Sequence, residues 1–134
     1  MIVIIDSNII FSSLLSKNSK FRSILLNPAI DFYTPNFLIS EIFKHKEKLI
    51  KNAKCTEEEV YEFLNKMLQR IHFVNDELIS FETANNAYEL CKDIDEKDTP
   101  FIALVLEFNG SFWTGDNLLI KGLKAKGFNN FFEQ

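Results

Sequence analysis

The chain has 134 residues, of which 46% are hydrophobic and 25% are charged, and its formal net charge is −4 at pH 7. This length suits one domain with its own hydrophobic core, so we expect a single domain over residues 1–134. The acidic balance argues against nonspecific nucleic-acid binding through the whole surface.

The first predicted strand covers residues 2–5, an unbroken β-branched run that is typical of a strand buried on both faces of a parallel sheet. Asp6, Ser7 and Asn8 follow it, and all three are good N-cap residues for the helical spacing that begins at Ile9. We therefore expect Asp6 at a corner between a buried strand and a helix, where parallel α/β sheets bind ligands. The alternative is that Asp6 only caps the helix.

Downstream of this unit, helices and strands alternate. Helical spacing begins near residues 20, 35, 56, 80, 99 and 116, and the predicted strands cover residues 30–34, 72–75, 111–114 and 128–132. The last of these strands is expected at an edge of the sheet. Strands that alternate with helices, after a first strand that is wholly apolar, predict a single α/β domain: a parallel β-sheet flanked by α-helices.

Local signals mark the starts of several of these helices. Ser19 can cap the short second helix, and Thr34 followed by Pro35 is typical of an N-cap and a proline at the first helical position. Thr56 and Glu59 have the spacing of a capping box. These signals predict where the chain turns between its elements.

Four carboxylates are expected at or near the rim formed by the carboxyl ends of the strands. Asp6 and Asp116 occupy strand-to-helix corners, and Asp98 opens an almost wholly apolar helix that leads into the strand before Asp116. Glu41 lies at the edge of the apolar side of its helix. Each acid could have a local role, as an N-cap or as a solvated helix residue, whereas one acidic pocket explains all four.

Carboxylates that are brought together repel one another. At about 4 Å a like-charged pair costs roughly 4 kcal/mol at an effective dielectric constant near 20. Such a pocket must therefore raise some pKa values or hold a cation. Oxygen ligands without His or Cys select Mg²⁺ or Mn²⁺, and these ions suit phosphodiester hydrolysis because they activate water and neutralise developing charge. Helix N-termini at the same rim would also favour a phosphate.

The cellular location is indicated by two further features. Cys55 and Cys91 are isolated thiols without metal-binding spacing, so we expect a reduced, cytoplasmic protein. The apolar runs are too short to span a bilayer, and the first strand begins at residue 2. We therefore expect neither a membrane span nor a targeting segment.

Four motifs, in this order, resemble the PIN-domain nucleases, a family that includes the small toxin ribonucleases of bacteria and archaea. They are Asp6-Ser-Asn, Ile-Ser-Glu41-Ile, Asp95-x-x-Asp98-x-Pro-Phe-Ile-Ala-Leu and Trp-Thr-Gly-Asp116. The resemblance extends from residue 1 to about residue 125. It implies a parallel sheet between helices, a divalent-metal site and cleavage of single-stranded RNA.

The resemblance also implies roles for individual residues. Carried over position by position, the four acidic residues of the family correspond to Asp6, Glu41, Asp98 and Asp116. Ser7, Asn8 and Thr114 match positions where the family often has a hydroxyl or an amide, which would position ligands or phosphate oxygens. Asp95 either assists the metal site from outside or is a solvated loop residue. Lys44, Lys46 and Lys121 are expected to guide the RNA backbone without reading bases.

The leading hypothesis is a Mg²⁺- or Mn²⁺-dependent endoribonuclease, the toxin of a toxin–antitoxin pair, with a small antitoxin protein as partner and a homodimer as its assembly. A non-catalytic RNA- or protein-binding module on the same fold is the alternative, which the complete set of four acids disfavours. A haloacid-dehalogenase-like phosphatase ranks lower because Asn8 stands where that chemistry needs a second Asp. A phosphotransfer receiver domain ranks lowest, since it needs adjacent acids and a later lysine that cannot be placed.

Overall fold

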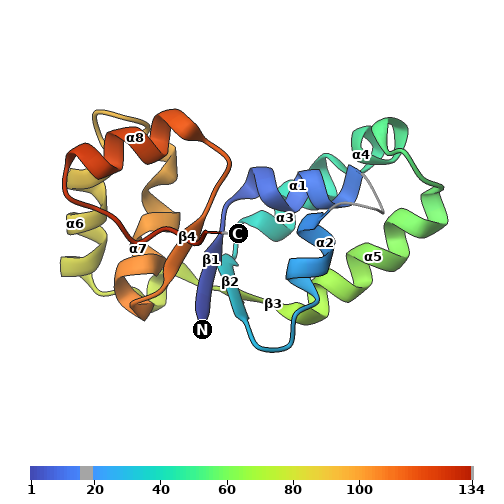
Figure 1. Cartoon of the computed structure of the whole chain (residues 1–134), viewed down its shortest axis with the longest axis horizontal. Helices are drawn as coiled ribbons and strands as arrows, with labels where there is room; N and C mark the ends of the chain where they lie inside the picture. Colours follow the sequence, from blue (N-terminus) through green and yellow to red (C-terminus); the bar gives the residue numbers. More distant parts are fainter. Residues whose placement is uncertain (16–19, 134) are drawn as a thin grey trace.

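The computed structural model, which describes residues 1–15 and 20–133, has a four-stranded sheet between two groups of helices (Figure 1). The strands are β1 (Ile2–Ile5), β2 (Asp31–Pro35), β3 (Ile71–Val74) and β4 (Ser111–Trp113). Their order is β3-β2-β1-β4 and every neighbouring pair is parallel. The predicted α/β domain with a parallel sheet is confirmed. Ser19, the predicted cap of the second helix, lies outside the described residues.

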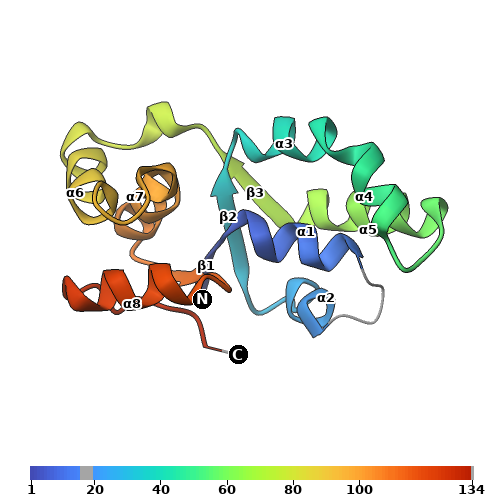
Figure 2. The ribbon, with the colours of Figure 1, turned by 90° about the horizontal axis from the view of Figure 1, so that it is seen from above.

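The helices form two layers, with α6, α7 and α8 on one side of the sheet and the first five helices on the other (Figure 2). They are α1 (Ser7–Leu15), α2 (Lys20–Leu25), α3 (Leu38–Lys44), α4 (Lys46–Asn52), α5 (Glu57–Arg70), α6 (Phe81–Cys91), α7 (Thr99–Phe108) and α8 (Asn117–Ala125). Two 3-10 turns, η1 (Asp76–Leu78) and η2 (Glu96–Asp98), precede α6 and α7. No helix in the described part of the chain is long and apolar enough to cross a membrane.

Strand β1 is central, and its composition explains its place. Val3, Ile4 and Ile5 are all 0% exposed, as expected for β-branched residues that are covered by helices on both faces. β1 pairs with β2 on one side and with β4 on the other, and α7 packs on β1 and β2. The carboxyl end of β1, and with it Asp6, therefore lies in the middle of the rim.

The predicted start of the third helix is wrong. Pro35 is the last residue of β2, and α3 begins at Leu38. The hydroxyl of Thr34 donates to the carbonyl oxygen of Ile5 at 3.0 Å, so Thr34 is a buried link between two strand ends and not an N-cap. Pro35 fits there because the pairing of β1 with β2 has already ended at Tyr33, which leaves β2 a neighbour on one side only.

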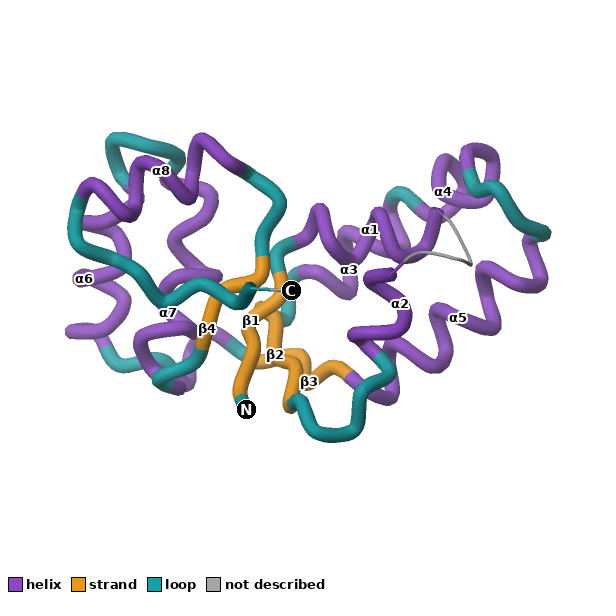
Figure 3. Tube along the Cα trace, in the orientation of Figure 1, coloured by secondary structure: helices purple, strands orange, loops and turns teal. Residues whose placement is uncertain are grey.

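The predicted strand over residues 128–132 is also wrong in extent. The segment after α8 is loop (Figure 3), and it contacts the sheet through a single parallel bridge between Phe112 and Phe131. The amide of Phe112 donates to the carbonyl of Asn130 at 2.8 Å, and the amide of Phe132 donates back to Phe112 at 2.9 Å. Aromatic packing also holds this segment, since the ring of Phe132 meets that of Trp113 edge-on at 5.4 Å. The segment protects the edge of β4 without extending the sheet.

Candidate active site

Asp6 is held rigidly at the end of β1. Its side chain is 5% exposed, and the Ser7 amide donates to Oδ1 at 2.7 Å. The Thr114 hydroxyl donates to Oδ2 at 2.6 Å, and the backbone amide of Asp6 donates to the Trp113 carbonyl at 2.9 Å. The position of this carboxylate is thus determined by both β1 and the end of β4.

Thr114 connects Asp6 to Asp116. Besides donating to Asp6, its hydroxyl accepts a hydrogen bond from the Asp116 amide at 3.1 Å. Oδ1 of Asp116 accepts from the Leu119 amide at 3.1 Å, which makes Asp116 the N-cap of α8. The capping role that the sequence left open for Asp116 is therefore real, and it also fixes the carboxylate beside Asp6.

Asp98 stands at the start of α7, where its carboxylate makes no capping hydrogen bond within the described chain. The pKa of Asp98 is raised to about 7. Partial burial is the largest cause, and repulsion from Asp6, Asp95 and Asp116 adds to it. Burial also raises the pKa of Asp6, although hydrogen bonds from Thr114 and Ser7 oppose this and repulsion from Asp116 adds to it. Asp6, Asp98 and Asp116, from three separate chain segments, thus form one acidic cluster.

An open pocket of about 570 Å³ lies beside this acidic cluster. Its lining residues come from α1, the α3 segment, η2 and α7, and they are Ser7, Phe11, Phe37, Leu38, Glu41, Asp95, Lys97, Asp98 and Phe101. Glu41 therefore faces the same pocket as Asp98, from the opposite side of the rim. Its side chain is 40% exposed, and its Oε2 lies 3.3 Å from Nε2 of His45.

The sequence model of the PIN domain matches residues 4–133. The chain belongs to the PIN-domain family. PIN domains are generally metal-dependent nucleases, so this chain has a nuclease fold. A search of curated proteins found no match.

The carboxylate oxygens of this PIN domain are of the chemical type that binds a divalent cation. Asp6, Asp98 and Asp116 offer oxygen ligands, and their mutual repulsion is the cost that a bound cation would offset. Among the described residues, however, no three His, Cys, Asp or Glu side chains are placed to hold a metal ion as they stand. A cation shared by Asp6, Asp98 and Asp116 would need these carboxylates closer together than the described structure has them.

The other residues singled out from the sequence lie around the acidic cluster. Oδ1 of Asn8 accepts from the Gly115 amide at 3.5 Å, a long contact between the first residues of α1 and the loop before α8. Asp95 lines the pocket, and its Oδ1 accepts from the Lys97 amide at 3.1 Å. Asp95 therefore shapes η2 and also contributes negative charge near Asp98.

Sequence reasoning missed Lys97. The predicted RNA-guiding lysines were Lys44, Lys46 and Lys121, whereas the lysine among the described residues that line the pocket is Lys97. The available signal was its place in the sequence, since Lys97 directly precedes Asp98, a predicted site residue, and lysines are common phosphate contacts.

Proposed function

We propose that the chain is a single nuclease domain over residues 1–134 that cleaves single-stranded RNA endonucleolytically with Mg²⁺ or Mn²⁺. The observation that supports this most strongly is the acidic cluster of Asp6, Asp98 and Asp116 beside an open pocket in a PIN domain. Like charges held together at a surface pocket favour the binding of a cation that can contact a phosphodiester.

In this proposal Asp6, Asp98 and Asp116 would hold the metal ion, and a bound divalent ion would supply activation of water and neutralisation of charge on the phosphate. Thr114 and the Ser7 amide keep the Asp6 carboxylate in one orientation through their hydrogen bonds. The remaining acid, Glu41, faces the pocket from α3 and orients the attacking water, with His45 restraining its carboxylate.

Lys97 is the residue that we propose to contact the scissile phosphate, because its side chain lines the same pocket as Asp98. Lys44 and Lys46, next to the break between α3 and α4, and Lys121 on α8 would guide the flanking RNA backbone. Such contacts bind RNA without selecting bases.

The test of the function is RNA cleavage by the purified protein. We expect single-stranded RNA to be cut with Mn²⁺ or Mg²⁺, cleavage to stop when EDTA is added, and excess metal to restore it. A single-stranded DNA of the same sequence is the control for the substrate class. Undiminished cleavage in EDTA would contradict the metal site, and RNA binding without cleavage would favour the non-catalytic module.

For the biological role we propose the toxin of a type II toxin–antitoxin pair that acts in the cytoplasm. Cys55 and Cys91 are unpaired within the described residues, which suits a reducing compartment. Exposed apolar side chains such as Phe43, at 53%, and Leu118, at 81%, suit contact with a protein partner, either an antitoxin or a second copy.

The expected assembly is a homodimer, in which exposed apolar residues such as Phe43 and Leu118 would be covered. Sedimentation equilibrium at micromolar concentration should give twice the chain mass of 15.6 kDa. Leu118→Asp and Phe43→Asp test the two candidate contact regions separately. A parent protein that sediments as a monomer over this range refutes the dimer.

A further inference from the structure

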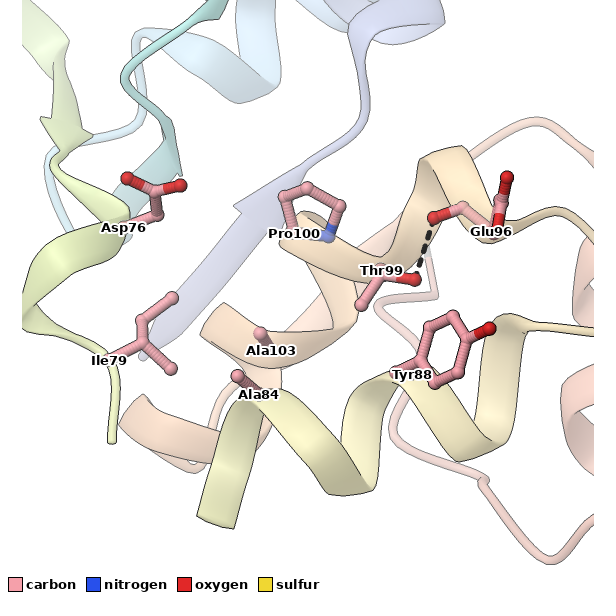
Figure 4. Close-up of a pocket in the computed structure, with 8 residues that line it drawn as sticks. All are labelled: Asp76, Ile79, Ala84, Tyr88, Glu96, Thr99, Pro100 and Ala103. Carbon is pink, nitrogen blue, oxygen red and sulfur yellow. Dashed lines mark hydrogen bonds between the residues drawn. The ribbon is translucent and has the colours of Figure 1, made fainter. Parts of the chain in front are cut away.

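A second cavity, of about 350 Å³, lies between η1, α6 and the first turns of α7. We call it the α6–α7 hollow, and its lining residues are Asp76, Ile79, Ala84, Tyr88, Glu96, Thr99, Pro100 and Ala103. Figure 4 shows Asp76 and Ile79 toward one end and Glu96 and Tyr88 toward the other, with the two alanines between them. The proposed cleavage reaction has no role for this hollow.

The α6–α7 hollow shares a wall with the pocket beside the acidic cluster. The wall is the stretch Glu96–Phe101, which comprises η2 and the start of α7. The residues of this wall line one cavity or the other. Glu96, Thr99 and Pro100 line the hollow. Lys97, Asp98 and Phe101 line the pocket beside the acidic cluster. One turn of chain therefore separates the proposed phosphate position from the hollow, so neighbouring parts of one bound chain can occupy both.

The lining of the hollow suits a flat, partly apolar group with hydrogen-bond donors at its edge. Ala103 forms a buried floor, and Tyr88, which is 43% exposed, offers an aromatic surface on which a ring can stack. Asp76 and Glu96 supply carboxylates, which repel a phosphate and accept hydrogen bonds from N–H groups. A nucleobase is flat and partly apolar and carries N–H donors at its edge, whereas the sugar–phosphate backbone is neither flat nor uncharged.

We propose that the α6–α7 hollow binds the nucleobase next to the scissile phosphate and favours guanine. This inference rests on the proposed ribonuclease function. Guanine presents two adjacent N–H donors on its Watson–Crick edge, which one carboxylate accepts together. Glu96 provides that carboxylate from the shared wall, and Tyr88, at the same end of the hollow, stacks on the base, while Asp76 adds negative charge at the other end.

A second copy of the chain fits the hollow less well. In a twofold contact each patch meets its own copy, so a dimer centred here would bring Asp76 and Glu96 close to the same acids of the partner subunit. Like charges in such a contact are unfavourable. The exposed residues Phe43 and Leu118, which are proposed above for self-association, lie outside the hollow's lining.

The experiment uses short RNAs that are identical except at one position, which carries G, A, C, U or inosine. Inosine keeps N1–H but lacks the exocyclic amine of guanine. With Mn²⁺ we expect kcat/KM to be highest for G and to fall at least about fivefold for inosine and further for U. Glu96→Gln should reduce this preference, and Tyr88→Ala should weaken binding of all five RNAs at least about fivefold.

Phe81→Ala is the matched control, because Phe81 is an 85% exposed aromatic residue on the same helix, α6, and does not line the hollow. Tyr88→Phe keeps the ring and should bind like the parent. RNA affinity is also measured in EDTA, where no cleavage is expected. If the protein binds G-containing RNA through Tyr88 but does not cleave RNA even with Mn²⁺, the nucleobase site is supported and the nuclease function is refuted. Unchanged affinity in Tyr88→Ala, or a change from dimer to monomer in that variant, overturns the nucleobase site.

Discussion

Asp6→Asn should lower the rate of RNA cleavage by at least about a hundredfold, which corresponds to about 2.7 kcal/mol of activation free energy. The substitution keeps the size of the side chain and removes the charge that would hold the metal at the centre of the rim. Because Asp6 is almost fully buried and held by both Ser7 and Thr114, no other carboxylate can move into its place without disturbing β1 and β4.

The measurement is single-turnover cleavage of a labelled RNA pool in saturating Mn²⁺, with circular dichroism to show that the variant folds. Asp31→Asn is the control, since Asp31 is an exposed carboxylate at the first residue of β2, at the opposite end of the sheet. Lys97→Gln should instead raise KM and flatten the salt dependence of binding. If Asp6→Asn cleaves as fast as the parent, the assignment of Asp6 is wrong.

Asp98→Asn should make the metal-free protein more stable at pH 8 while it removes Mn²⁺ binding. Burial and the neighbouring acids raise the pKa of Asp98 from 3.8 to about 7, so the folded chain retains a proton that the unfolded chain loses near pH 4. The free energy of unfolding of the parent therefore falls as the pH rises from about 4 to about 7. Above about pH 7 the whole loss of stability that comes from ionising Asp98 in the folded chain remains.

An asparagine at this position cannot ionise, so the variant lacks this penalty. We expect a gain of about 1–2 kcal/mol at pH 8, reduced by the access of water to the pocket, and equal stabilities near pH 4. Urea unfolding in EDTA at pH 4, 6 and 8 measures the difference, and added Mn²⁺ should stabilise only the parent. A variant that is less stable at pH 8, or that Mn²⁺ stabilises as much as the parent, contradicts the acidic cluster as a metal site.

The parts of this fold that sequence reasoning predicted are those determined by local patterns. Residues 2–5 are apolar and β-branched, and they form the central strand with Asp6 at its end. The capping box of Thr56 and Glu59 is present at the start of α5, as predicted. Asp6 and Asp116 are brought together because parallel strands end at one rim, and Asp98 joins them because α7 starts beside that rim before it leads into β4.

The errors arose where a distant part of the chain decides the structure. The pair Thr34 and Pro35 predicts a helix start. In the structure the Thr34 hydroxyl instead donates to the Ile5 carbonyl, and the pairing with β3 extends β2 through Pro35. Residues 128–132 have strand composition, yet they make one bridge because aromatic packing holds them against β4. The α6–α7 hollow had no local signature, since it forms only where two helices and η1 meet.

The two-sided wall between the cavities has an evolutionary consequence. Along Glu96–Phe101, side chains that line the hollow are interspersed with side chains that line the acidic pocket. A substitution at Glu96 can therefore change the lining of the hollow without replacing Asp98. The Thr99 hydroxyl, which donates to the Glu96 carbonyl at 2.6 Å, and the buried packing of α7 on β1 keep the wall in place. Under the proposed function, a lineage of such proteins could change the RNAs it binds by mutation of residues on one side of a single turn, while Asp98 on the other side is retained.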